Sequence, residues 1–201
     1  VMVAWLREAR SQEAQQQAGW SGCLSLPREV YLKPDGHLGQ RPPPELAVLR
    51  RKTWRAENVR MTRERMTVAS ELGGECLEVR VRARLLESGT LTLRLRRSPE
   101  GQEETLLIYD RWNGTLTLDR QRSSLDATVN RGPKACPLKL GAEEALDLTV
   151  YLDRSVVEVF ANGGTAMTCR IYPTRADSTG VDFLWAGSTT EVERFEVCEL
   201  P

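Results

Sequence analysis

Residues 148–173 read LTVYLDRSVVEVFANGGTAMTCRIYP and contain the side chains whose types and spacing could do chemistry. Asp153 and Glu158 are two carboxylates close together in sequence, and paired carboxylates can perform general acid/base work. That chemistry needs a substrate-sized gap between the two groups and a shaped cleft around them. Arg154 and Arg170 on the same segment could instead pair with the carboxylates and hold a sheet together. An active site and a structural network are therefore the two interpretations to separate.

The pattern around these residues predicts a three-stranded meander. Apolar residues alternate on both sides of the charged group, at Leu148, Val150 and Leu152 and again at Val157, Val159 and Ala161. Asp153-Arg154-Ser155 fits a tight reversal, because Asp and Ser side chains can bond to nearby backbone N–H groups. Asn162-Gly163-Gly164 fits a second reversal, because Asn and Gly tolerate positive φ.

On this meander Glu158 and Arg170 lie on adjacent strands, opposed or diagonal, and can form a cross-strand ion pair. No cleft is implied between Asp153 at a turn and Glu158 in mid-strand. We therefore favour an architectural role, in which Asp153 and Ser155 close the turn and Glu158 is held by Arg170 or another Arg. Glu158→Ala should then lower stability by about 1–3 kcal/mol, since a half-buried Arg would lose its partner. Equal melting temperatures for variant and parent would count against this.

Beyond Glu71 the sequence repeatedly predicts short strands. In CLEVRVRARLL, charged residues alternate with apolar ones, namely Leu77, Val79, Val81, Ala83 and Leu85. Asn113-Gly114 between two strand-like runs is a strong hairpin signal. About ten such strands without a long helical pattern predict an all-β fold, an antiparallel sandwich or barrel.

The first part of the chain predicts a different organisation. VMVAWL is expected to be a short buried strand, residues 11–18 a polar loop, and GWSGCLSLPREVYL two extended pieces broken at Pro27. Three prolines, residues 42–44, predict a connector between two bodies, and Pro44 suits the first position of a short helix. Because Met2 follows Val1, we expect the N-terminus to have been cut from a longer protein.

Composition excludes several classes of function. The 201 residues include 28 acidic and 28 basic residues, a balance that gives no support for a polyanion-binding protein. His37 is the single His, which excludes a multi-His metal site. No C-x-x-C pair occurs among the five Cys, which argues against zinc and a disulfide framework and leans toward a cytoplasmic compartment. No apolar run approaches the ~20 residues that span a bilayer. No cofactor, metal, nucleic acid or membrane is therefore predicted as a partner.

Two other groups of residues have a functional alternative. A basic stripe would form on one sheet face if two strands pair, from Arg80, Arg82, Arg84, Arg94 and Arg96. A solvated outer face balanced by nearby Glu residues is the favoured interpretation. Trp112, next to the hairpin turn, and Trp20 are candidate sugar contacts, although Trp more often packs in a core or an interface.

Several segments together resemble one family, glycoside hydrolase family 32, the invertases, levanases, inulinases and sucrose-6-phosphate hydrolases. The C-terminal motif is carried by Asp153-Arg154-Ser155, Glu158-Val159-Phe160, Asn162-Gly163 and Arg170-Ile171-Tyr172-Pro173. The upstream segment is carried by Trp20, Gly22, Ser25, Pro27, Arg28 and Glu29. YDRWNGTLTLDR is similar to the family's middle hairpin, and the segments follow in the family's order.

The resemblance implies a C-terminal β-sandwich, jelly-roll-like with two packed sheets, that accompanies a catalytic β-propeller. It implies that residues 1–44 are the last propeller strands plus the connector, and that residues 45–201 are the sandwich. The family's W-M-N-D-P-N-G and R-D-P motifs are absent here. Glu75-Cys76 spells the family's E-C pair but lies in the predicted sandwich, so no catalytic residue is assigned.

The resemblance thus implies a non-catalytic module of a β-fructofuranosidase, with its own propeller, sucrose or fructan, and a second copy of the chain as candidate partners. The parent enzyme would use a retaining double displacement. A carbohydrate-binding module for fructans is the alternative, and a polyanion-binding Arg stripe is a third possibility.

Overall fold

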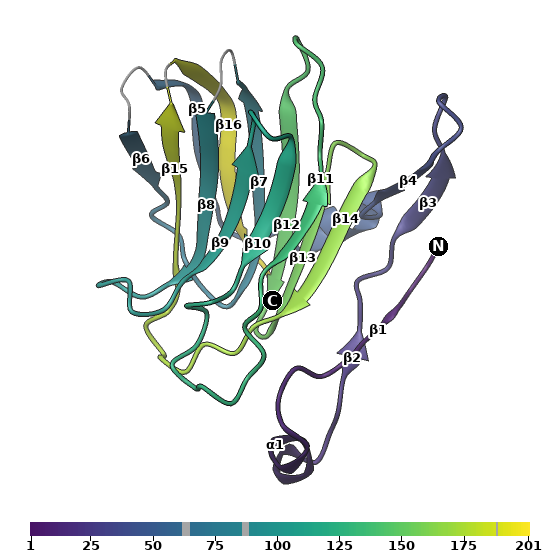
Figure 1. Ribbon diagram of the computed structural model, residues 1–201, viewed down its shortest axis with the longest axis vertical. Coiled ribbons are helices and arrows are strands. Elements are labelled where there is room, and N and C mark those ends of the chain that lie inside the picture. The colour runs from purple at the N-terminus through teal and green to yellow at the C-terminus, as the bar shows by residue number, and fades with distance from the viewer. Residues whose placement is uncertain (62–64, 86–88, 188) are drawn as a thin grey trace.

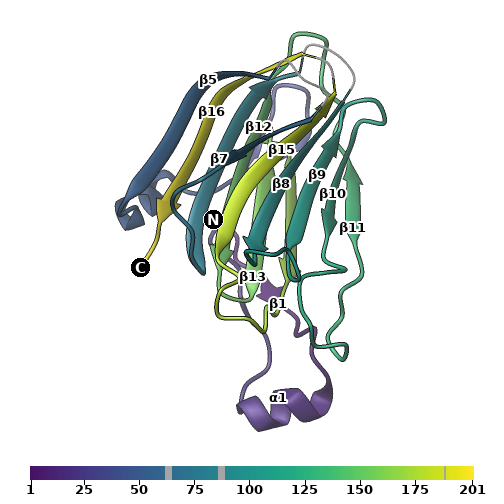
Figure 2. The same cartoon turned by 90° about the vertical axis from the view of Figure 1, so that its left-hand side faces the viewer.

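The computed structural model describes residues 1–201 except 62–64, 86–88 and 188, and consists mainly of two antiparallel six-stranded sheets packed face to face (Figures 1 and 2). The first sheet has the order β14 (Thr165–Arg170), β13 (Val156–Ala161), β12 (Leu146–Asp153), β7 (Cys76–Arg84), β16 (Thr190–Glu199) and β5 (Thr53–Met61). The second has the order β11 (Lys134–Pro137), β10 (Thr115–Asp119), β9 (Thr105–Asp110), β8 (Gly89–Arg97), β15 (Gly180–Gly187) and β6 (Arg65–Ala69). The predicted antiparallel β-sandwich is confirmed.

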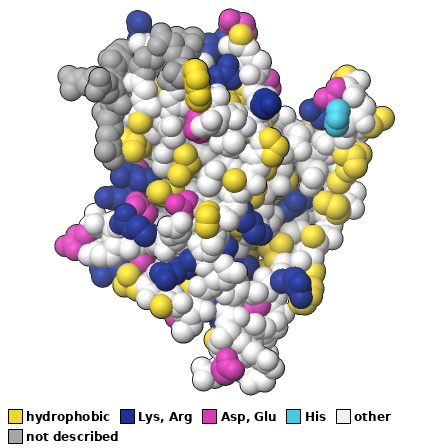
Figure 3. Space-filling view, in the orientation of Figure 1, with side chains coloured by type: hydrophobic (Ala, Val, Ile, Leu, Met, Phe, Trp, Pro, Cys, Tyr) yellow, Lys and Arg dark blue, Asp and Glu magenta, His cyan; other side chains and the backbone are white. Residues whose placement is uncertain are grey.

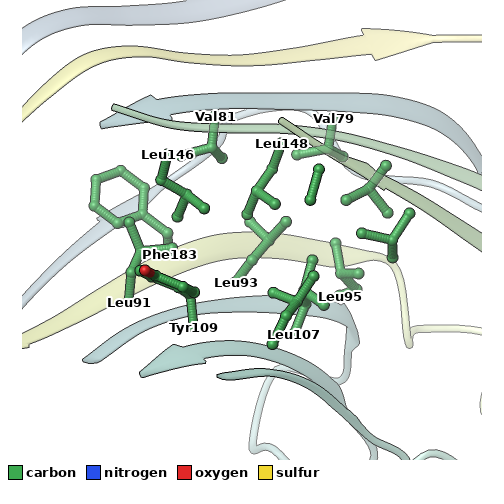
Figure 4. Packing of buried hydrophobic residues seen from close by; sticks show 14 of the residues in the cluster. Val79, Val81, Leu91, Leu93, Leu95, Leu107, Tyr109, Leu146, Leu148 and Phe183 are labelled. Carbon is green, nitrogen blue, oxygen red and sulfur yellow. The ribbon is translucent and has the colours of Figure 1, made fainter. Parts of the chain in front are cut away.

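The core forms because each strand turns alternate side chains inward. The alternating apolar residues of β7, Leu77 to Ala83, are fully buried, as the sequence pattern predicts. Figure 4 shows Val79 and Leu148 of one sheet meeting Leu93 and Phe183 of the other. Burial of this many Leu, Val and Phe side chains is the dominant stabilising contribution to the sandwich, at about 1.5–3 kcal/mol for each.

The two predicted reversals of the meander are confirmed. β12 pairs with β13, and β13 with β14, all antiparallel. Arg154 takes φ 50° in the first turn. Asn162 and Gly163 take φ 46° and 62° in the second, where the Gly164 N–H donates to the carbonyl of Ala161. The predicted hairpin at Asn113-Gly114 is also present, between β9 and β10.

Residues 1–41, which we call the arm, lie against one side of the sandwich (Figure 1). The arm contains β1 (Trp5–Leu6) paired with β2 (Cys23–Leu24), and β3 (Glu29–Leu32) paired with β4 (Leu38–Arg41). The 3₁₀ helix η1 (Pro44–Leu49) leads from the arm to β5, with Pro44 at its start as predicted.

Two predictions for the arm are wrong. Residues 12–18 form the helix α1 (Gln12–Ala18) and not a loop, because Ser11 caps its first turn and Gly19 ends it at φ 74°. α1 projects beyond the sandwich (Figure 2). VMVAWL forms only the short strand β1, and its Val1, Val3 and Trp5 are exposed, not buried.

The number of strands also differs from the sequence prediction, because β5, β6 and β11 were not predicted. β5 lies at the edge of its sheet. Along this strand half-buried residues alternate with exposed ones, but apolar residues do not alternate with charged ones, so the sequence lacks the usual strand pattern. Charged edges of this kind oppose pairing with other chains.

Candidate functional site

The outer face of the first sheet carries a row of polar residues that holds the N-terminal part of the chain. Glu78, Tyr151, Glu158 and Thr168 are successive cross-strand partners on β7, β12, β13 and β14, so their side chains share one face. Both glutamates are almost fully buried because residues before β5 cover them. We call this row, together with Ser155 and Arg170, the seat.

An ion pair between Arg28 of the arm and Glu158 is the centre of the seat. Arg28 Nη2 lies 2.5 Å from Glu158 Oε2 and donates also to Thr168 Oγ1. The backbone N–H of Leu26 donates to Glu158 Oε1 at 2.6 Å. The side chains of Arg28 and Glu158 are only 9% and 2% exposed, so removal of either would leave a buried charge without its partner.

Glu158 is therefore held by an Arg, as predicted, and of the two alternatives that the sequence left open the partner is another Arg, Arg28, and not Arg170. The residue across the strand from Glu158 is Thr168, while Arg170 faces Val156. Arg28 lies 130 positions away in the sequence, and local strand register gives no indication of it. The sequence singles out Arg28 only as part of the upstream resemblance to the family.

Arg170 forms a second contact between arm and seat. Its Nη2 donates to Ser155 Oγ at 2.9 Å and lies 3.7 Å from Glu8 Oε2, and its Nη1 donates to Cys23 Sγ at 2.7 Å. Burial alone would raise the pKa of Glu8, but the hydrogen bond from Arg10 and the charge of Arg170 hold it below its ordinary value. The Ser155 hydroxyl thus helps to position Arg170, which contacts the arm, and is also part of the turn.

The other predicted motif residues have separate surroundings. Asp153 is exposed at the end of β12 and accepts a weak hydrogen bond from the Cys76 thiol at 3.7 Å. Phe160 is buried, packs edge-on to Tyr151, and lies 5.4 Å from the Arg28 guanidinium carbon. The roles assigned to these residues remain predictions.

The hollow beside Asp153 and Glu158 has a volume of about 150 Å³. Ligand pockets usually have volumes of at least ~300 Å³. Both oxygens of Glu158 already accept hydrogen bonds. The arrangement supports attachment of the arm better than acid/base chemistry.

The β3–β4 hairpin shows the two faces of the arm. Tyr31 Oη donates to the carbonyl of Gly163 at 2.8 Å, and Gly39 lies so close to the Tyr31 ring that a Cβ there would be 2.4 Å from it. The alternate residues point away from the sandwich: Val30 is exposed, and Leu32 and Leu38 are 71% and 65% exposed. Figure 3 shows hydrophobic side chains along the edge of the molecule where β3 and β4 lie.

Arg50, which lies between η1 and β5, also forms an ion pair with the seat. Arg50 forms two hydrogen bonds to Glu78, of 2.5 and 2.7 Å, in the planar two-bond geometry that Arg and carboxylate favour. These bonds raise the pKa of Arg50 and keep it charged.

The basic stripe, the less favoured of the two interpretations, does not form, because β7 and β8 belong to different sheets and cannot place their arginines on one face. On β7, Arg80 pairs with Glu196, and Arg82 with Glu193 and Asp147. On β8, Arg94 pairs with Asp182, and the buried Arg96 pairs with Glu75, the Glu of the E-C pair. The stripe therefore offers no unpaired basic surface.

The two candidate sugar contacts lie in different environments. Trp20 is 47% exposed, and its ring is contacted by the guanidinium groups of Arg10 and Arg170 at 4.6 and 5.4 Å. Trp112 is 82% exposed, at the β9–β10 turn. His37 is exposed at the tip of the β3–β4 hairpin, beside Asp35.

Sequence reasoning missed a buried carboxylate, Glu103, at the end of the sandwich near α1. Its oxygens accept hydrogen bonds from the backbone N–H groups of Leu125, Thr174 and Arg175 and from the hydroxyls of Thr174 and Ser178. Burial raises the pKa of Glu103, but these hydrogen bonds outweigh burial and lower it to about 2. The partners come from two loops, β10–β11 and β14–β15, and Glu103 lies in a third, so no local pattern could reveal them.

Within the residues that the structure describes, no group of three or more His, Cys, Asp or Glu is placed to hold a metal ion. Among the described residues, no helix has the length and apolarity needed to span a membrane.

Comparison with known proteins gives a family match. Residues 45–199 match the sequence model of the C-terminal domain of glycosyl hydrolases family 32. The match covers more than half of the chain and includes all of the seat, whereas the arm residues that bind the seat lie outside it.

Individual relatives agree with this match. The chain is 34% identical over 180 residues to raffinose invertase of Escherichia coli, covering 89% of this chain and 35% of that protein. It is 29% identical to sucrose-6-phosphate hydrolase of Zymomonas mobilis, covering 90% and 35%. The fold of fructan 1-exohydrolase IIa from Cichorium intybus superposes with a TM-score of 0.82 at 17% identity, over 98% of this chain and 44% of that one. The chain thus spans about a third of the length of these curated relatives.

Proposed function

Because the chain belongs to the family of C-terminal domains of glycosyl hydrolases family 32, we propose that it is the β-sandwich module of a β-fructofuranosidase that acts on sucrose or fructans. The names of the relatives, an invertase and a sucrose-6-phosphate hydrolase, support this substrate class. In such an enzyme a separate catalytic domain would carry out the reaction, and residues 1–201 would contribute no reacting group.

The arm is the part that would meet the catalytic domain. Residues 1–44 would be the last strands of a β-propeller plus the connector, and residues 45–201 the sandwich. The observation that carries this is the two-faced β3–β4 hairpin, with Tyr31 and Gly39 turned to the sandwich and Leu32 and Leu38 turned to solvent. An exposed apolar face on a paired strand is typical of a surface that another body covers.

The function of the seat is then to fix the position of the arm on the sandwich. The Arg28–Glu158 pair is directional, and a buried ion pair with matched hydrogen bonds specifies one register of the arm on the seat. The module would stabilise and orient its catalytic partner without contributing a reacting group.

A chimera tests this function. The C-terminal part of E. coli raffinose invertase that matches this chain would be replaced by residues 1–201, and sucrose hydrolysis would be measured alongside that of the chain alone. The proposal predicts a soluble chimera that hydrolyses sucrose and a chain that does not.

A matched swap provides the control. The corresponding part of the Z. mobilis sucrose-6-phosphate hydrolase, placed in the same E. coli enzyme, reports whether the junction tolerates replacement. An active control beside an inactive or insoluble chimera would contradict the proposal, as would sucrose hydrolysis by the chain alone.

A further inference from the structure

We propose that Trp112 and the residues around it form a carbohydrate-binding platform that stacks one hexose ring of a glycan chain. We define the platform as Arg111, Trp112, Asn113, Gly114, Lys139 and Leu140, which line one hollow. The choice of fructans as ligands rests on the proposed function, whereas the platform itself rests on the geometry below.

The first observation is the exposure of the Trp112 indole. At 82% it is far more exposed than Leu125, another apolar residue in a loop of the sandwich, which is 56% exposed. Large aromatic rings bury 150–250 Å² when they pack, so leaving one in water forgoes a substantial stabilisation. The apolar C–H face of a sugar ring is complementary to such an indole, since it offers flat apolar area rimmed by hydroxyls.

The second observation is that the turn carrying Trp112 is held rigidly. The Asp110 carboxylate accepts hydrogen bonds from the backbone N–H groups of Trp112 and Asn113, at 2.9 and 3.1 Å, and from the Asn113 amide at 2.6 Å. Arg111 donates to the carbonyls of Leu140 and Gly141, both at 3.0 Å, and so ties the neighbouring loop to the turn. Because the backbone that carries the indole is already ordered, ligand binding costs no further ordering of the turn.

The third observation is the set of polar groups around the ring. Asn113 Oδ1 remains an acceptor because only the NH₂ of its amide is used toward Asp110. Lys139 Nζ has no hydrogen bond or ion pair with any residue that the structure describes. Together they offer an acceptor and a donor beside the indole, which is the combination that neighbouring sugar hydroxyls require.

The shape and position of the hollow agree with this ligand. Its volume is about 340 Å³, at the lower end of the range of small-ligand sites and suited to one or two sugar rings. Gly114, at φ 60°, leaves space at the base of the hollow, because a Cβ there would lie only 2.9 Å from Lys139 Cγ. The arm bonds to β13, β14 and the 119–134 region, so among the described contacts it leaves the β9–β10 turn open.

Titration of the full chain with inulin, levan and dextran, followed by Trp fluorescence and calorimetry, tests the platform. We expect saturable binding of at least one glycan, weakened about tenfold or more in Trp112→Ala. Trp5→Ala removes another exposed Trp, in the arm, and should leave affinity unchanged. Because Trp112 is exposed, Trp112→Ala should melt at the temperature of the parent.

The outcomes separate the two proposals. Binding of inulin or levan that depends on Trp112 supports the platform, whereas binding of dextran alone supports it with a glucan as ligand and contradicts the fructan choice. No saturable binding, or equal affinity in Trp112→Ala and the parent, overturns the platform. Neither result changes sucrose hydrolysis by the chimera, which tests the proposed function separately.

Discussion

The sandwich and the arm are stabilised by different physical means. The core of the sandwich is a continuous apolar cluster drawn from both sheets, with Leu93, Tyr109 and Phe183 fully buried. The arm attaches mainly through polar and charged groups, such as Arg28 and Glu8, and keeps apolar side chains in solvent. The difference indicates that apolar burial stabilises the sandwich, whereas the arm is held by polar contacts and has an exposed apolar face.

This comparison has an energetic basis. Burial of apolar area stabilises by about 25 cal/mol per Å² and needs no specific geometry. A buried ion pair contributes less net stability than apolar burial, because the cost of desolvating the two charges offsets their attraction. Removal of one partner is nevertheless costly, because the other charge stays buried and unpaired. The seat therefore determines where the arm lies, and the core determines whether the sandwich folds.

The largest expected effect comes from the core. Leu93→Ala should lower the free energy of unfolding by about 2–5 kcal/mol, because a fully buried Leu leaves a cavity. Urea denaturation measures this. Leu125→Ala, at an exposed position of the same sandwich, should change stability by less than ~0.5 kcal/mol. Similar values for the two variants would contradict a core-dominated sandwich.

The next effect comes from Glu103 and depends on pH. The pKa of Glu103 is about 2 in the folded protein, below its ordinary value of 4.5. The ionised carboxylate therefore stabilises the fold by about 3 kcal/mol above pH 5, and this stabilisation is lost as the pH falls from 4.5 toward 2. Glu103→Gln should lose this stabilisation at pH 7 and differ little from the parent near pH 2. Stability curves that run parallel from pH 7 to 2 would refute the assignment.

A smaller effect is expected at the Arg28–Glu158 pair. Glu158→Ala should cost about 1–3 kcal/mol, and the double-mutant cycle with Arg28→Ala should give a coupling energy of about 1–3 kcal/mol, because the groups share one buried contact. Arg82→Ala with Glu193→Ala, a more exposed pair on the same sheet, is the control and should couple by less than ~1 kcal/mol. Additive single effects for Arg28 and Glu158 would argue against the seat.

The smallest effect is expected on the outer face of the arm. Leu32→Ser should change the stability of this chain by less than ~0.5 kcal/mol, because Leu32 contacts solvent. In the invertase chimera the same change should cost about 1–3 kcal/mol if the catalytic domain covers it. Leu125→Ser, outside the arm, should have a small effect in both settings. An equally small effect of Leu32→Ser in both would contradict a covered face.

Local sequence patterns were sufficient to predict those strands and turns whose conformation depends on neighbouring residues. Alternation in β7 and the Asn162-Gly163 turn follow from period and backbone conformation, and both are present. The helix α1 was missed because its polar Gln run has no apolar face, although Ser11 was available as a cap. The Arg28–Glu158 pair and the Glu103 cluster join residues 130 and about 70 positions apart, so only the folded chain brings them together.

Hydrogen–deuterium exchange of the full chain, with and without Arg28→Ala, tests most directly whether the arm is held separately from the sandwich. The N–H groups of Leu26 and Gln40 bond to Glu158 and Gly163 and so report docking of the arm, while those of β7 and β12 report the core. We expect exchange at Leu26 and Gln40 to accelerate roughly five- to 150-fold in the variant, with β7 and β12 unchanged. Equal acceleration in arm and core, or none in the arm, would contradict the account.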